Sequence, residues 1–313
     1  MKKWMLTILL AAGAFSALSA QESPESFKSR YETLTKHVGI DGVGVESLLE
    51  RWEKAYPEDP DMLTARFNLY LSKALSTAVV AKRQDRFLGA RPVLVLKDSL
   101  GADVNYFEET FYSDSLFALA SSSIDKAVKL YPDRLDLRFA SITSLMAYEK
   151  ESPDMATAAL SALIDYNGTV HPAWKYGDEP ADEDLFKAGI QEYCATLYTI
   201  GSPTSLESFR SLSEKMLKYD PKNTLFMSNI GTYYFIARKD NKSARKYYDK
   251  VLKIDPSDYT SIKNSVLMAR RDGNVKLEKK YLPMLAKYGA DDAEKAAASA
   301  RLQALNTKKL SIN

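Results

Sequence analysis

Cysteine is almost absent from the sequence: it occurs once in 313 residues, at Cys194. A single cysteine excludes an internal disulfide. Its surroundings, QEYCATLY, have apolar residues at helical spacing, and this pattern predicts a buried thiol. Lipid-anchored bacterial exports carry a cysteine directly after the cleavage point of their signal. Because Cys194 is far from the N-terminus, we expect no lipid anchor.

Histidine is also scarce, and the two present, His37 and His171, are far apart in the sequence. Neither has the short spacing to a second ligand that zinc sites show. The sequence contains no P-loop and no G-x-S-x-G motif, and GIDGVG at 39–44 has no strand before it. We therefore expect no metal, no cofactor and no enzymatic activity.

The chain has no excess of charge of either sign. It holds 43 basic and 41 acidic residues, and removal of Lys2 and Lys3 with a signal peptide leaves 41 of each. A neutral chain has no general attraction to nucleic acid or to anionic lipid. We expect no nucleic-acid partner.

A long apolar run is missing, but a short one follows Lys2 and Lys3, from Met5 to about Leu10, with small residues after it. This run is shorter than the roughly 20 residues that a membrane-spanning helix needs. The pattern is that of a secretory signal peptide over residues 1–20, cleaved after Ser19 or Ala20. We expect an exported protein, periplasmic or extracellular, with no membrane span.

Prolines recur at the ends of segments with helical periodicity. Because proline disfavours helix at the residue before it, each marks a helix end. From Pro221 to Pro256 the interval is 35 residues, and a further stop comes near Gly289. The segments are ERWEKAYPEDP (Pro57 and Pro60), IDKAVKLYPD (Pro132), SEKMLKYDP (Pro221) and DKVLKIDP (Pro256).

Each full interval contains two helices. NTLFMSNIGTYYFIA and SARKYYDKVLKI both have apolar residues at helical spacing, and the polar turn RKDNK joins them. This unit resembles the tetratricopeptide repeat (TPR), a helical hairpin of about 34 residues. The resemblance rests on Ile230-Gly231, Tyr234, Ala244, Tyr248 and Pro256. The spacing from Gly231 to Ala244 is one residue longer than the family pattern, which indicates an insertion in the turn.

The resemblance implies an all-α, right-handed solenoid of helical hairpins. In it, Gly231 and Ala244 would allow close helix approach, and Tyr234 and Tyr248 would fill the space between hairpins. We expect N-terminal hairpins over 21–164, C-terminal hairpins over 185–313, a first helix from Pro24 to His37, and a capping helix over 291–309.

Two intervals are too long for the repeat. The first surplus falls near residues 91–114, where β-favouring runs flank the turn Asp98–Gly101, and it predicts a β-hairpin inserted near 91–110. The second surplus, around YNGTVHPAWKYGDEPADED, predicts a long ordered loop over 165–184.

An asparagine series supports a binding groove. Asn68, Asn229 and Asn264 each lie eight residues after a helix-ending proline. The resemblance implies a concave groove lined by the first helix of each hairpin, in which amides hydrogen-bond an extended peptide. We therefore predict a non-catalytic scaffold that binds a protein or peptide partner. The implied lining is Asn68, Ser228, Asn229, Thr232, Lys263 and Asn264.

Two alternatives centre on the loop at 165–184. Trp174 and Tyr176 are aromatic platforms of the kind that bind sugars, which makes a glycan an alternative ligand. Asp178 and Glu179, with the acids at 182–184, could furnish a glycosidase site. The structural alternative is that the last acids cap the following helix, LFKAGIQEYCATL.

Overall fold

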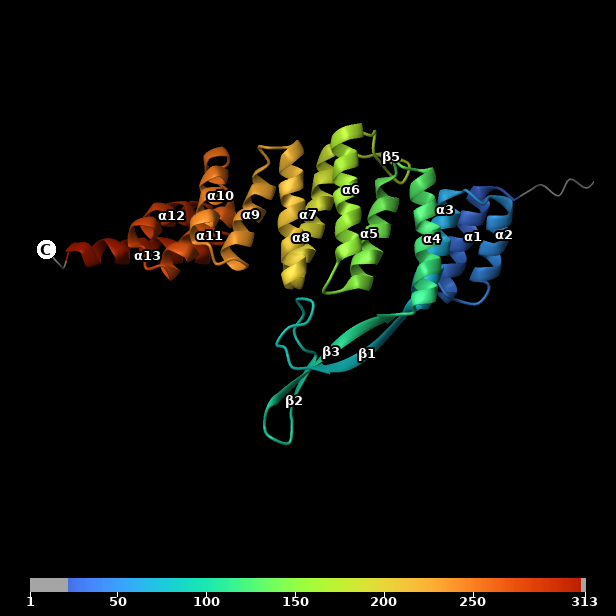
Figure 1. The fold of residues 1–313 in the computed structure, drawn as a ribbon, viewed down its shortest axis with the longest axis horizontal. Coiled ribbons are helices and arrows are strands. Elements are labelled where there is room, and N and C mark those ends of the chain that lie inside the picture. The colour runs from blue at the N-terminus through green and yellow to red at the C-terminus, as the bar shows by residue number, and fades with distance from the viewer. Residues whose placement is uncertain (1–21, 311–313) are drawn as a thin grey trace, which may run out of the picture.

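The computed structural model describes residues 22–310, so the predicted signal peptide at 1–20 lies outside the described residues. These residues form helices and two small sheets (Figure 1). The helices are α1 (Pro24–Val38), α2 (Val45–Ala55), α3 (Pro60–Ala74), α4 (Asp114–Leu130), α5 (Leu135–Glu149), α6 (Asp154–Val170), α7 (Glu183–Ile200), α8 (Pro203–Tyr219), α9 (Thr224–Ile236), α10 (Asn241–Ile254), α11 (Tyr259–Arg271), α12 (Val275–Tyr288) and α13 (Asp292–Leu310). The strands are β1 (Leu75–Lys82), β2 (Leu94–Lys97), β3 (Asp103–Tyr112), β4 (Lys175–Tyr176) and β5 (Glu179–Pro180).

The helices pair into consecutive hairpins, from α1 with α2 to α11 with α12, and stand in one row (Figure 1). Each odd-numbered helix from α1 to α11 is the first of its hairpin. Helix α13 packs on α12 at the end of the row. The predicted fold, a TPR-like solenoid of helical hairpins with a small β insertion, is confirmed.

The prolines end helices as predicted. Helices α2, α4, α8 and α10 each end two residues before Pro57, Pro132, Pro221 or Pro256. The next helix begins with a capping side chain in three of these cases, because Asp59, Asn223 and Asp258 accept hydrogen bonds from backbone amides of the first turn. A proline stop followed by a polar cap thus turns the chain at three of these four positions.

Small residues set the distance between neighbouring helices. A Cβ added to Gly231 on α9 would lie 2.6 Å from Cε1 of Tyr248 on α10. The ring of Tyr248 is fully buried, and its hydroxyl contacts Thr232 and Asn264 at 3.0 and 2.9 Å. This one side chain therefore joins α9, α10 and α11, and the predicted close approach at Gly231 is confirmed.

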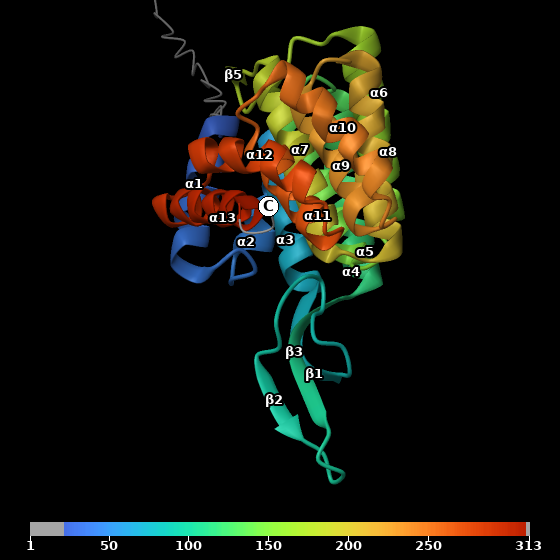
Figure 2. The same ribbon diagram turned by 90° about the vertical axis from the view of Figure 1, so that its left-hand side faces the viewer.

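The inserted β structure is larger than predicted. The hairpin of β2 and β3 is present, with its turn at Asp98–Gly101, but β1 adds a third strand and the sheet order is β1-β3-β2. Strand β1 was not predicted because it follows α3 directly, and no glycine or proline marks the change from helix to strand at Ala74 and Leu75. The sheet extends away from the helices (Figure 2). It leaves from the turn between α3 and α4, so the two helices of that hairpin still pack together.

The long loop predicted over 165–184 is shorter in the structure, because α6 continues to Val170. Gly168 lies inside this helix, where an added Cβ would be 2.3 Å from the ring of Tyr219 on α8. The glycine therefore serves helix packing, not a turn. Only residues 171–182 connect α6 to α7, and they include the small β4–β5 hairpin.

Two further predictions are confirmed. The C-terminal helix α13 begins after Asp291, whose carboxylate accepts the amide of Glu294. Cys194 is fully buried on α7, and burial raises the pKa of its thiol to about 12. At neutral pH this thiol is therefore protonated and sheltered from solvent.

A buried carboxylate ties the last three helices together. Glu278 on α12 is 2 % exposed and pairs with Arg270 on α11 at 2.7 Å and with Arg301 on α13 at 2.9 Å. The hydrogen bonds from Arg301 outweigh the opposing effect of burial and, with that from Arg270, hold the pKa of Glu278 below its usual value. The charged form of Glu278 therefore stabilises the end of the solenoid.

We expect Gly231→Ala to lower the free energy of unfolding by about 1–3 kcal/mol, because the added methyl group overlaps the Tyr248 ring. Urea titration followed by circular dichroism measures the change. The double variant Gly231→Ala with Tyr248→Leu tests the cause, since removal of the ring makes room for the methyl group. If the loss of unfolding free energy in the double variant equals the sum of the losses in Gly231→Ala and Tyr248→Leu alone, the proposed contact is contradicted.

We expect Glu278→Gln to lower the free energy of unfolding at pH 7 by about 2 kcal/mol. The folded-state pKa of Glu278 is depressed, so the wild-type advantage is present above the unfolded-state pKa of about 4.3 and is lost as the pH falls through the folded-state pKa. Urea titrations between pH 7 and pH 3 should show the two proteins converging on the acid side. A difference that is constant with pH would refute this role.

Candidate functional site

Within residues 22–310, the odd-numbered helices line three of the hollows. The central hollow, of about 680 Å³, lies between α5 and α7. The N-terminal hollow, of about 370 Å³, lies between α3 and α5, and the C-terminal hollow, of about 270 Å³, lies among α7, α9 and α11. The central and N-terminal hollows share Phe139, Thr143, Ala147 and Tyr176. They therefore form one continuous depression across α5.

The central hollow is mainly apolar. Its floor includes Tyr193, whose hydroxyl donates to the carbonyl of Phe139 at 2.8 Å and lies 2.9 Å from Oγ1 of Thr143. Burial raises the pKa of Tyr193 to about 12, so its hydroxyl stays protonated over a wide pH range. The other large apolar and aromatic lining residues are Leu88, Phe139, Met146, Tyr176, Leu185 and Ile200.

The inserted β structure closes one end of the central hollow. Leu88, in the loop between β1 and β2, lines the hollow, and the next residue, Gly89, packs on Thr199 of α7. Gly89 has a φ of +82°, and a Cβ there would lie 2.5 Å from the Thr199 side chain. In Figure 1 this loop lies below the ends of α7 and α8. The insertion is therefore a wall of the hollow, in addition to being a protruding sheet.

A charged cluster fastens this wall to α5. Glu109 on β3 contacts Lys150, at the end of α5, at 2.5 Å and Lys82 on β1 at 2.9 Å. Burial alone would raise the pKa of Glu109, but the hydrogen bonds from Lys150 and Lys82 outweigh it and hold the pKa below its usual value. The cluster thus carries two positive charges and one negative charge at neutral pH, beside the hollow that Lys150 helps to line.

The C-terminal hollow contains four of the six residues predicted to line a groove: Asn229, Thr232, Lys263 and Asn264. The amides are already engaged within the protein. Asn229 donates to Gln191 at 2.8 Å and to Ser213 at 3.2 Å, and Asn264 donates to the Tyr248 hydroxyl. The structure therefore brings the predicted residues together, but gives both asparagine amides a role in helix packing.

The other two predicted lining residues lie elsewhere. Ser228 is buried and lies 3.3 Å from Ser261, Oγ to Oγ, between α9 and α11. Asn68 lies on α3, outside the lining of all three hollows. Ser228 therefore takes part in the packing of α9 against α11, and neither residue faces a hollow.

The predicted role of Trp174 in ligand contact is corrected by its burial. The indole is 4 % exposed, stacks on Phe186 and donates to Asn167 at 2.7 Å. Such a ring offers no free face to a sugar. Tyr176 differs, because its side chain is 52 % exposed and lines the central hollow. Of the two aromatic residues in this loop, only Tyr176 is available to a ligand.

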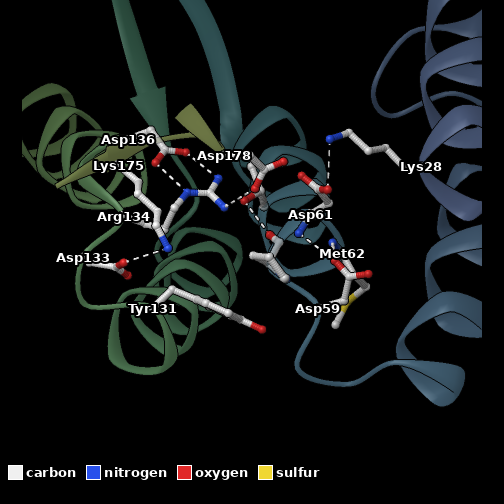
Figure 3. A network of polar contacts seen from close by, with 12 residues as sticks. Lys28, Asp59, Asp61, Met62, Tyr131, Asp133, Arg134, Asp136, Lys175 and Asp178 are labelled. Carbon is white, nitrogen blue, oxygen red and sulfur yellow. Dashed lines mark hydrogen bonds and ion pairs between the residues drawn. The ribbon is translucent and has the colours of Figure 1, made fainter. Parts of the chain in front are cut away.

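The acids of the same loop support the structure around them. Asp178 lies 3.9 Å from Arg134, which also pairs with Asp136 (Figure 3). Asp182 caps α7 by accepting the amide of Leu185, as the structural alternative predicted. Glu183 accepts a hydrogen bond from Asn167. The acids of this loop therefore cap a helix or form polar pairs at the surface, and these contacts support the structure of the loop.

Within residues 22–310, no group of histidine, cysteine or acidic side chains has a geometry suited to a metal ion. No helix in the same range is both long enough and apolar enough to cross a membrane.

The central hollow itself was not predicted. One signal for it exists in the sequence: Leu185, Ala188, Glu192 and Thr196 recur at helical spacing on α7, on the side away from the core, and all four are exposed. Small side chains at Ala147 and Ala188 leave the space between α5 and α7 unfilled. This signal is hard to recognise because the facing side chains come from segments distant in sequence.

No protein-family model matches the sequence, and no curated protein matches it significantly. Several solved structures are similar in fold. YrrB, a TPR protein with an unusual peptide-binding site, is 12 % identical, with a TM-score of 0.37 over 80 % of this chain and 94 % of its own. PilF of Pseudomonas aeruginosa is 10 % identical, with a TM-score of 0.35 over 88 % and 96 %. The flexible tandem repeat domain of a bacterial cellulose synthase is 15 % identical, with a TM-score of 0.28 over 92 % and 98 %. At these identities the likeness concerns the fold alone.

Proposed function

We propose that this protein is a non-catalytic scaffold that holds a segment of a partner protein in the central hollow. The observation that carries the proposal is the hollow itself: about 680 Å³ of mainly apolar space, open to solvent, between two helices of a rigid solenoid. Ligand sites in proteins are commonly of this size and are lined by apolar and aromatic side chains with a few polar groups.

The length of the hollow favours a chain segment as its occupant. Its lining residues on α7 run from Leu185 to Ile200, which corresponds to roughly 22 Å of helix. An extended peptide covers that distance with about seven residues. The hollow is thus too long for one side chain, and it suits a segment that places several apolar side chains along α5 and α7.

The energetics are compatible with reversible binding. Each leucine- or phenylalanine-sized side chain buried in the hollow contributes about 1.5–3 kcal/mol, against the cost of ordering the segment. Glu192 lies among the apolar lining residues, and its carboxylate can accept a hydrogen bond from a peptide backbone. The hydroxyls of Thr143 and Thr196 also line the hollow, and each already makes one hydrogen bond within the protein. The proposed site does not include the amides of Asn229 and Asn264, which line the C-terminal hollow.

We further propose that the protein is exported and acts in the bacterial cell envelope or outside the cell. Support comes from Lys2 and Lys3, followed by the short apolar run and the small residues up to Ala20. The balanced charge of residues 21–313 agrees with a protein partner better than with a nucleic acid.

We expect peptide binding to be lost when the central hollow is filled. Ala147 and Ala188 are exposed and line the hollow, so Ala147→Trp and Ala188→Trp place an indole where a segment would lie. Peptides selected from a random display library by the wild-type protein should bind each variant at least tenfold more weakly, a loss of about 1.4 kcal/mol. Fluorescence anisotropy measures the affinity.

The matched control for this test is Ala158→Trp, on an exposed position of α6 outside all three hollows. It should bind the selected peptides as the wild type does, and circular dichroism should show all variants folded. A library that yields no binding peptide, or peptides that bind the filled variants unchanged, would refute the proposed site.

We expect the chain expressed in a Gram-negative host with residues 1–20 in place to be found in the periplasm, beginning at Ala20 or Gln21. N-terminal sequencing of the fractionated protein checks both points. In the comparison chain, Lys2 and Lys3 are replaced by glutamate. This change removes the positive charge at the start of the signal, so less of the chain should reach the periplasm. Full-length wild-type protein confined to the cytoplasm would contradict export.

A further inference from the structure

The central hollow has charges of opposite sign at its two ends. One end is closed by the basic loop, which we define as residues 82–91, through Leu88. This loop contains four cations and one acid: Lys82, Arg83, Arg86 and Arg91, with Asp85. The other end is bordered by Tyr176 and Leu185, which lie within the acidic loop, defined as residues 175–185.

The basic loop is only partly neutralised by the protein. Lys82 shares the carboxylate of Glu109 with Lys150, so that one negative charge faces two positive ones. Arg83, Arg86 and Arg91 are exposed, and none pairs with a carboxylate within 4.0 Å in the described part of the chain. Arg86 donates to the backbone carbonyl of Gly89, in the stretch that packs on α7. The loop therefore keeps a positive charge beside the hollow.

The acidic loop keeps a negative charge at the opposite end. It contains five acids and one lysine: Asp178, Glu179, Asp182, Glu183 and Asp184, with Lys175. Arg134 lies 3.9 Å from Asp178, and Lys187 lies 3.9 Å from Glu183. Both cations also pair with other acids, Arg134 with Asp136 and Lys187 with Asp220. All five acids are exposed, so the surplus negative charge faces solvent.

From this polarity we infer that the central hollow selects a protein segment with an apolar middle, acidic residues at the end that meets the basic loop, and basic residues at the end that meets the acidic loop. This inference rests on the proposed function and adds the chemistry and direction of the occupant. Complementary potentials orient a bound chain and raise its association rate, and a segment of reversed polarity meets like charges at both ends. The charge pattern thus fixes which way the segment runs along α5 and α7.

The test uses one apolar core of about seven residues, taken from a peptide that the wild-type protein selects from the display library. Three fluorescein-labelled peptides carry this core with different ends: glutamates before and lysines after it, lysines before and glutamates after it, or glutamines at both ends. One of the two charged orders should bind at least tenfold more tightly than the other, with the neutral peptide between them. This preference should shrink as salt rises from about 0.05 to about 0.5 M, because salt screens exposed charges.

The double variant Arg83→Glu with Arg91→Glu should abolish or invert this preference without changing the affinity for the neutral peptide. The matched control is Lys253→Glu with Lys276→Glu, two exposed lysines on α10 and α12, which reverses the same number of charges away from the hollow. It should retain the wild-type preference.

The possible results separate the two proposals. If the three peptides bind the wild type equally, or if the basic-loop variant keeps the wild-type preference, the inferred polarity is wrong while peptide binding stands. If the library yields no binding peptide, the proposed function fails and the polarity fails with it. A preference that disappears in the basic-loop variant and persists in the control establishes the polarity.

Discussion

The close approach of neighbouring helices through glycine is the contact on which the solenoid depends. Gly231 makes room for the ring of Tyr248, Gly189 for that of Phe139, and Gly168 for that of Tyr219. In each case an aromatic ring from the neighbouring helix fills the space of the missing side chain, so the packing between helices is dense without strain. Because each hairpin contacts mainly the next, these contacts fix the course of the whole row.

The same contacts create the central hollow. Gly189 brings α7 onto the Phe139 ring of α5 near the core, while Ala147 and Ala188 leave the outer space between these helices unfilled. The insertion then closes one end, held by the Glu109 cluster and by the contact of Gly89 with Thr199. A departure from the repeat thus turns a regular inter-helix space into a bounded site with a positive end.

Several features could be predicted from the sequence because they depend on local chemistry. Proline stops and polar caps set the hairpin register, and the β2–β3 hairpin has a turn with its own sequence signal. Strand β1 was missed because no turn residue separates it from α3. Gly168 suggested a loop but lies in a helix, since its role is to admit Tyr219. Trp174 suggested a ligand contact but is a core residue, because Asn167 satisfies its indole N–H.

By itself, the sequence determined the hairpin architecture, the position of the insertion and the absence of a cysteine pair, because each follows from residues close together in the chain. Tertiary structure alone decided which side chains face the ligand space. Asn229 and Asn264 were predicted to bind a peptide, yet their amides hydrogen-bond neighbouring helices. Leu88 and Ala147 carried no such signal, yet they line one hollow together with Tyr176, the loop aromatic that was predicted as a possible ligand contact. Burial and proximity depend on how distant segments pack, and no local pattern specifies that.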